Sequence, residues 1–85
     1  MKVIHGPRFL RDYANLDPAI QRRVDKQIKL FLENPRHHSL RIHKMGGYSD
    51  IYEARVTKAY RFTFQISGET YILRRVGTYD ILKTP

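Results

Sequence analysis

Three segments in the last third of the chain indicate the fold, and in the first two of them apolar and polar residues alternate. The segments are Asp50-Ile-Tyr-Glu-Ala-Arg-Val56, Tyr60-Arg-Phe-Thr-Phe-Gln-Ile66 and Tyr71-Ile-Leu-Arg-Arg-Val-Gly-Thr-Tyr-Asp80. A period of two is typical of a strand with one face on a core. Short connections separate the segments, and one of them, Ser67-Gly-Glu69, suits a hairpin turn. We therefore predict three antiparallel strands.

The alternation also predicts which side chains share a face. In the first strand, Ile51, Glu53 and Arg55 share the side opposite Tyr52, Ala54 and Val56. In the second, Arg61 lies on the side opposite the apolar residues. We expect this side of the sheet to be exposed. The third strand, Thr70 to Val76, mixes both patterns, so we leave its faces unassigned and interpret it as a central strand that is buried in part on both sides.

Two helices are predicted ahead of these strands. The first runs from about Pro7 to Ala14, with apolar residues at helical spacing. The second begins at Asp17-Pro18, where the aspartate can accept backbone N–H bonds and the proline fits the first helical position. It ends at Asn34-Pro35, because the residue before a proline avoids helical geometry. Its apolar residues form one stripe, in which Gln27 is the single misfit.

Two further segments complete the expected fold. Met1 to His5 is a short strand candidate, and Leu40 to His43 also alternates before Gly46-Gly47 allows a bend. The elements are therefore ordered strand, helix, helix and then three antiparallel strands. This order predicts a single α+β domain over residues 1–85, with a two-helix hairpin on one face of a four-stranded, mainly antiparallel sheet.

Composition narrows the classes of function. The 85 residues carry 16 Lys and Arg against 8 Asp and Glu, a net charge of +8, which suggests nucleic acid, an acidic membrane surface or an acidic protein as partner. There is no cysteine, hence no disulfide or thiolate metal site, and the histidines match no zinc pattern, so we expect no metal or cofactor. The N-terminus lacks the apolar core of a signal peptide, and no apolar run would span a membrane, so we expect a cytoplasmic protein without membrane contact.

The order of elements, taken with particular residues, resembles the RelE/ParE superfamily of bacterial toxins over nearly the whole chain. The residues that carry the resemblance are Leu40 to Gly47 followed by Tyr-Glu-Ala-Arg-Val, the strand start Tyr60-Arg-Phe62, and the closing Arg75-Val-Gly-Thr-Tyr-Asp80. The last of these is most similar to the RelE and YafQ branch of messenger-RNA interferases. The resemblance implies the toxin of a type II toxin–antitoxin system, which cleaves mRNA in the ribosomal A site without a metal and inhibits translation. Its implied partners are a cognate antitoxin, mRNA and ribosomal RNA.

Candidate site residues follow from the chemistry of metal-free RNA cleavage, which needs a base, cations at the phosphate and an acid. Glu53 is the candidate base, and Arg55 and Arg61 are candidates for stabilising the charge on phosphorus. Tyr79 stands where the interferase branch often has histidine, so it is the candidate acid, or it stacks on a base. Further RNA contacts are predicted at Lys44, Arg74, Arg75 and Asp80.

Each of these residues also has a structural interpretation. Glu53 and Arg55 can form a solvated ion pair, Arg61 can bridge to an acidic residue, and Tyr79 can be a packing residue at the sheet edge. Of the adjacent Arg74 and Arg75, we expect only one to reach the site, since neighbours on a strand point to opposite faces. Two other functions stay open: a ParE-like toxin that inhibits gyrase, and a non-catalytic RNA-binding module.

Overall fold

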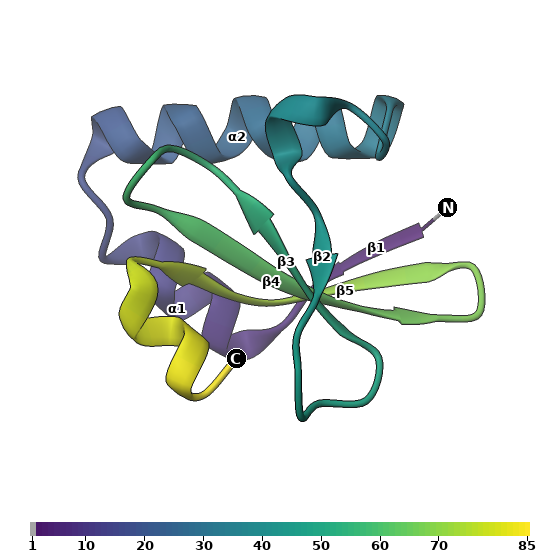
Figure 1. Cartoon of the computed structure of the whole chain (residues 1–85). Helices are drawn as coiled ribbons and strands as arrows, with labels where there is room; N and C mark the ends of the chain where they lie inside the picture. The colour runs from purple at the N-terminus through teal and green to yellow at the C-terminus, as the bar shows by residue number, and fades with distance from the viewer. Residues whose placement is uncertain (1) are drawn as a thin grey trace.

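The computed structural model describes residues 2–85 and shows one mixed sheet with helices packed on it (Figure 1). The elements are, in order, β1 (Lys2–His5), α1 (Pro7–Ala14), α2 (Pro18–Glu33), the 3-10 helix η1 (His38–Leu40), β2 (His43–Lys44), β3 (Ile51–Arg55), β4 (Arg61–Ser67), β5 (Thr70–Gly77) and the 3-10 helix η2 (Tyr79–Lys83). The sheet order is β1-β5-β4-β3-β2, with β1 parallel to β5 and the other pairs antiparallel. None of the helices in residues 2–85 combines the length and apolar character that a bilayer crossing needs.

The α+β prediction is confirmed, with one difference in the strand count: the sheet has five strands rather than four. The alternating segment Leu40 to His43, which is not among the four predicted strands, contributes only its last residue to the additional strand β2. Leu40 is fully buried and belongs to η1, and Arg41 turns the chain with a left-handed backbone at φ 46°. Only His43–Lys44 then pairs with β3. Both helices have the predicted bounds, whereas Met1 of the first strand candidate lies outside the described residues.

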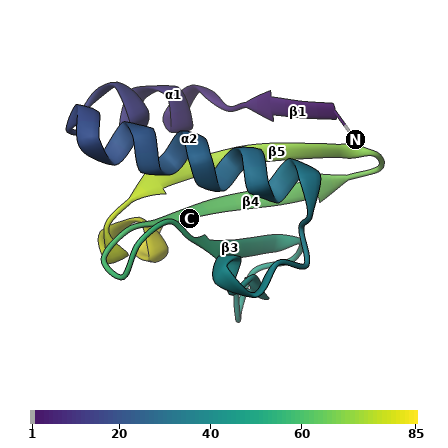
Figure 2. The same cartoon turned by 90° about the horizontal axis from the view of Figure 1, so that it is seen from above.

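Helix α2 lies across one face of the sheet (Figure 2) and supplies the centre of the core. Its start is capped as predicted, since the Asp17 side chain accepts a bond from the Ala19 N–H at 3.3 Å. Near its end, Phe31 packs against Phe62 and Phe64 of β4, with ring centroids 5.6 and 4.6 Å away. This face of the sheet is therefore closed by aromatic packing, and the chemistry must lie on its reverse or at its edges.

A bulge explains why alternation did not assign the faces of β5. Thr63 pairs with Arg75 and Phe64 with Leu73, so Arg74 is an extra residue without a partner on β4. The alternation therefore breaks at this point. The interpretation of β5 as a central strand is confirmed, because it lies between β1 and β4.

Asp12 of α1 fixes the edge of β5 that β1 leaves open. Strand β1 pairs with β5 as far as Leu73, and beyond that point the Asp12 carboxylate accepts the Val76 N–H at 3.1 Å. The same carboxylate lies 2.7 Å from Arg75 Nε and 3.1 Å from its Nη2. This hydrogen bond is the main cause of the raised pKa of Arg75, which therefore stays charged.

We expect Asp12→Ala to lower the free energy of unfolding by about 2 kcal/mol, because the half-buried Arg75 guanidinium loses its carboxylate partner and the Val76 N–H loses its acceptor. Urea denaturation measures the loss. The matched control is Glu33→Ala, which removes the same charge from an exposed helical position and should change stability by less than about 0.5 kcal/mol. Equal effects of the two substitutions would contradict this role for Asp12.

Candidate functional site

The site is centred on Glu53, whose carboxylate is held between two side chains from neighbouring strands. Strand pairing places His43 of β2 directly opposite Glu53. His43 Nε2 lies 3.1 Å from Glu53 Oε2, and Arg61 Nε of β4 lies 3.2 Å from Oε1. Glu53 is only 8% exposed, so the expectation of a solvent-exposed carboxylate is wrong. Its side chain lies on the side of β3 opposite the core residue Ala54, and the paired side chains of β2 and β4 enclose it.

Arg61 connects Glu53 to the turn between β3 and β4. Its Nη1 donates to the carbonyl oxygens of Thr57, Lys58 and Tyr60, and its Nη2 donates to the Tyr79 hydroxyl at 2.8 Å. A guanidinium has five N–H groups, and these contacts leave one on Nη2. The interpretation of Arg61 as a bridge to an acidic residue is therefore confirmed. It still adds positive charge to the site, but it has little capacity left to grip a phosphate with two donors.

Two exposed groups flank this buried pair. Tyr79, at the start of η2, is 55% exposed, and its ring centroid lies 4.8 Å from Arg61 Cζ. The His43 side chain is 63% exposed. A bound molecule would therefore contact an imidazole and a phenol, both of which can transfer protons. The buried ion pair holds both groups in place, since Glu53 contacts His43 and Arg61 donates to Tyr79.

Arg55 is the arginine at this site with a free guanidinium. Its Cα pairs with that of Arg61, which places both residues on the Glu53 side of the sheet. Across residues 2–85, the Arg55 side chain forms no hydrogen bond or ion pair, and its backbone carbonyl accepts from Gln27 Nε2 at 2.9 Å. The ion pair interpreted for Glu53 and Arg55 is thus made by Arg61 instead.

The structure does not bring the four predicted RNA-contact residues into this cluster. Lys44 pairs with Tyr52, which faces the core side, so it points away from Glu53. Arg75 is separated from Glu53 by the buried Thr63, a distance of two strands or about 10 Å. Asp80 is exposed on η2.

Arg74 and Arg75 turn to the same region instead of diverging. Arg74 donates to the Pro85 carbonyl oxygen and to Gln65 Oε1, while Arg75 donates to Thr84 as well as to Asp12. The expectation that these neighbours point to opposite faces is wrong, because the bulge at Arg74 interrupts the alternation.

His43 is the site residue that sequence reasoning missed. The sequence suggests no more for His43 than a metal ligand, a surface residue or a phosphate contact. Across residues 2–85, no group of three or more His, Asp or Glu side chains can hold a metal ion. The short alternation that ends at His43 indicates an extended segment. It would have identified His43 as a neighbour of Glu53 only if the pairing register of this segment with β3 were known. That register is set by a loop whose Asp50 has a left-handed backbone, which the sequence pattern did not reveal.

The Glu53–Arg61 pair should be energetically coupled, since removing either partner leaves the other charge enclosed. We expect a double-mutant cycle of Glu53→Gln and Arg61→Gln to give a coupling of about 1–3 kcal/mol in the free energy of unfolding. Arg55→Gln provides the matched control, because Arg55 is the strand neighbour of Arg61 yet does not bond to Glu53. A coupling of Glu53 to Arg55 as large as that to Arg61 would contradict the geometry.

Comparison with known proteins gives the same family as the sequence resemblance. No protein-family model matches the chain. The toxin RelE3 of Methanocaldococcus jannaschii is 33% identical over 82 residues, which cover 89% of this chain and 88% of that protein. Among solved structures, YafQ from Escherichia coli BL21(DE3) superimposes with a TM-score of 0.78 at 14% identity, covering 95% of this chain and 96% of that one. The RelB–RelE antitoxin–toxin complex from Methanococcus jannaschii superimposes with a TM-score of 0.76 at 23% identity, covering 95% of both chains.

The structural matches establish the fold, and the identity to RelE3 over most of both chains establishes the family. The chain belongs to the RelE family of toxins.

Proposed function

We propose that this protein is the toxin of a type II toxin–antitoxin pair and acts as a metal-independent endoribonuclease that cuts mRNA on the ribosome, in the cytoplasm. The observation that carries the proposal is the buried Glu53 carboxylate between His43 and Arg61, with the unpaired Arg55 guanidinium beside it. A carboxylate–imidazole contact next to a free cation suits proton transfer at a phosphodiester.

The reaction needs one proton removed and one supplied. The ribose 2′-hydroxyl loses its proton and its oxygen attacks phosphorus, while the bond from phosphorus to the 5′-oxygen breaks and that oxygen gains a proton. Glu53 was the sequence-based candidate for the base. Because both of its oxygens are engaged and it is enclosed, we propose that it acts through His43, holding the ring while the exposed imidazole exchanges the proton.

The other side chains take roles that match their contacts. The Arg55 guanidinium is free to bind the phosphate and to stabilise the charge that develops on it. Arg61 holds the turn after β3 and orients the Tyr79 phenol, which can donate a proton or stack on a base. On this proposal Tyr79 and His43 share the acid and base roles, so a histidine in the closing segment is not required.

Cleavage should depend on the three groups that meet the substrate or position it. In a translating extract, we expect His43→Gln, Glu53→Gln and Arg55→Gln each to reduce message cleavage by about 100-fold or more, the size of a lost proton-transfer or charge-stabilising group. Primer extension on the message measures the cuts. His5→Gln, an exposed histidine on the far edge strand β1, is the control and should cleave normally.

Thermal unfolding of every variant separates loss of chemistry from loss of fold. A wild-type protein that leaves message intact while ribosomes translate would overturn the nuclease proposal. If DNA supercoiling failed instead, the activity would be that of a gyrase inhibitor. Salt-dependent RNA binding without cuts would leave a non-catalytic RNA-binding module.

The proposed partner is an antitoxin with an acidic or amphipathic segment. The support is the net charge of +8 and the similarity to a RelE protein that was solved in complex with RelB. We expect the protein encoded next to this one to bind with a dissociation constant well below micromolar and to suppress cleavage, as measured by titration calorimetry and by the extract assay. Absence of binding at micromolar concentration would count against a toxin–antitoxin pair.

A further inference from the structure

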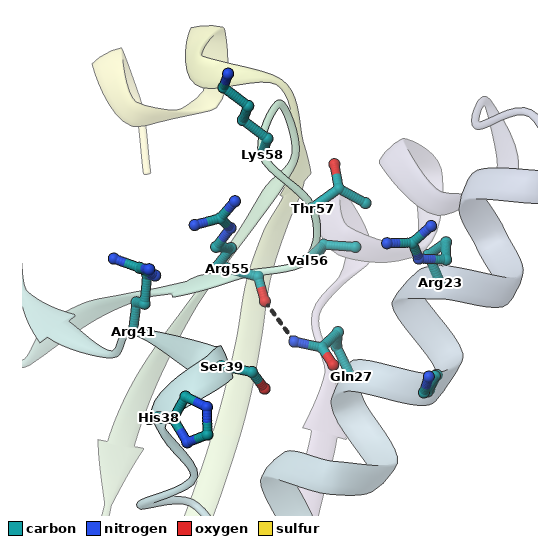
Figure 3. A pocket seen from close by; sticks show the side chains of 10 residues that line it. Arg23, Gln27, His38, Ser39, Arg41, Arg55, Val56, Thr57 and Lys58 are labelled. Atoms are coloured by element: carbon teal, nitrogen blue, oxygen red, sulfur yellow. Dashed lines mark hydrogen bonds between the residues drawn. The ribbon is translucent and has the colours of Figure 1, made fainter.

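A second basic site lies beside the cluster around Glu53, in a hollow between α2 and the end of β3. It has a volume of about 390 Å³ (Figure 3). Its lining is Arg23, Lys26, Gln27, His38, Ser39, Arg41, Arg55, Val56, Thr57 and Lys58. Figure 3 shows Arg23 and Gln27 on the helix side, with Arg41, Arg55 and His38 on the other. These residues come from segments far apart in the sequence, so the folded structure builds the hollow.

Gln27 connects the two sides of the hollow. It is the polar misfit in the apolar stripe of α2, and its side chain donates to the Arg55 carbonyl oxygen at 2.9 Å across the hollow (Figure 3). This bond ties the middle of α2 to the last residue of β3. On the opposite rim, the Arg41 backbone adopts the left-handed conformation at the end of η1. One side of the hollow is therefore joined to the other by a bond from a side chain to the backbone.

The charges around the hollow have one sign. Arg23, Lys26, Arg41, Arg55 and Lys58 line it, and no aspartate or glutamate does. Cations that line one concavity repel each other and attract an anion. The low-dielectric walls of a concavity strengthen the positive potential inside it, which favours anion binding. Within residues 2–85, these side chains form no ion pair that would neutralise them, since the ion pairs of this part of the chain involve His43, Arg61 and Arg75.

We propose that the hollow binds a phosphate group of an RNA backbone, separate from the phosphate that is cut. This inference rests on the proposed function, because it assigns the hollow to the RNA that this protein engages. Guanidinium groups pair with phosphate through two parallel bonds, and a hollow of this size lies within the range of small-ligand pockets. An acidic peptide suits it less well, because Val56 is the one apolar lining residue and peptide anchors need apolar contact.

The hollow and the Glu53 cluster share residues, which places the two phosphates on one path. Arg55 lines the hollow and is the strand partner of Arg61. Lys58 also lines the hollow, and its carbonyl oxygen accepts bonds from Arg61 and Tyr79. RNA that follows the turn between β3 and β4 would therefore pass from one site to the other, with Arg55 between them.

The test removes charge from the hollow without touching the residues assigned to chemistry. Arg23→Gln/Lys26→Gln alters two exposed positions of α2 that line the hollow, and Arg22→Gln/Lys29→Gln removes the same charge from the same helix outside it. The probes are a single-stranded RNA with 2′-O-methyl groups, which cannot be cut, and ribosomes without message. Anisotropy over a range of salt concentrations measures binding of the RNA, and co-sedimentation measures binding to ribosomes.

We expect the Arg23→Gln/Lys26→Gln variant (the hollow pair) to bind RNA at least about fivefold more weakly. The slope of log affinity against log salt concentration should fall by about 0.7 for each phosphate contact that is lost. The Arg22→Gln/Lys29→Gln variant (the control pair) should change in affinity by less than about twofold. Loss for the oligonucleotide means that the phosphate belongs to message, and loss for ribosomes alone assigns it to ribosomal RNA. Equal losses for the two pairs would overturn the inference, since the effect would be one of net charge. An effect confined to binding of an antitoxin would overturn it as well, in favour of a protein partner.

The uncleavable probe keeps this test separate from the proposed nuclease activity. If the wild-type protein cuts no message but the hollow pair still loses RNA affinity, the nuclease proposal fails and the hollow stands as a phosphate site. If cleavage occurs and the hollow pair binds RNA as the control pair does, the hollow inference fails alone. As a second readout, inorganic phosphate should shift the Gln27 side-chain amide resonances of the wild-type protein at constant ionic strength, and chloride should not. A phosphate titration that leaves them unmoved would overturn the inference.

Discussion

The contact between Glu53 and Arg61 holds the other side chains of the site in place. It places a carboxylate and a guanidinium, each about nine-tenths enclosed, 3.2 Å apart on adjacent strands. Such a pair is stable only if its remaining polar atoms are also bonded. Here His43 contacts the second carboxylate oxygen, and three carbonyl groups and the Tyr79 hydroxyl accept from the guanidinium. Everything proposed for catalysis is arranged around this closed network.

The arginines of this network have different roles. Arg61 fixes the turn between β3 and β4, and Arg75 joins the edge of β5 to α1 through Asp12. Arg55, which takes no side-chain bond in residues 2–85, is left for a ligand. A net charge of +8 therefore overstates the number of phosphate contacts, because some cations are structural. Four further cations line the hollow together with Arg55, and no aspartate or glutamate is among the lining residues.

Much of the fold was predictable from local patterns. Helical spacing and the Asp17-Pro18 start gave both helices their bounds, and period-two alternation located β3 and β4 and their faces. The resemblance on the closing segments indicated the family, and identity to RelE3 confirms it. These predictions succeeded because neighbouring residues determine propensity and periodicity, and one buried face selects the register.

Local sequence patterns were enough to give the order of the elements, the excess of cations, and the placing of Glu53, Arg55 and Arg61 on neighbouring strands with Tyr79 after the last strand. Which of these side chains touch one another depends on the folded chain. The pairing of β2 with β3 brought His43 to Glu53, the bulge at Arg74 turned both neighbouring arginines toward the C-terminal residues, and the Gln27 bond brought α2 to the end of β3 to form the hollow. The physical reason is that register, bulges and helix docking are fixed by contacts between residues distant in sequence, which local periodicity does not encode.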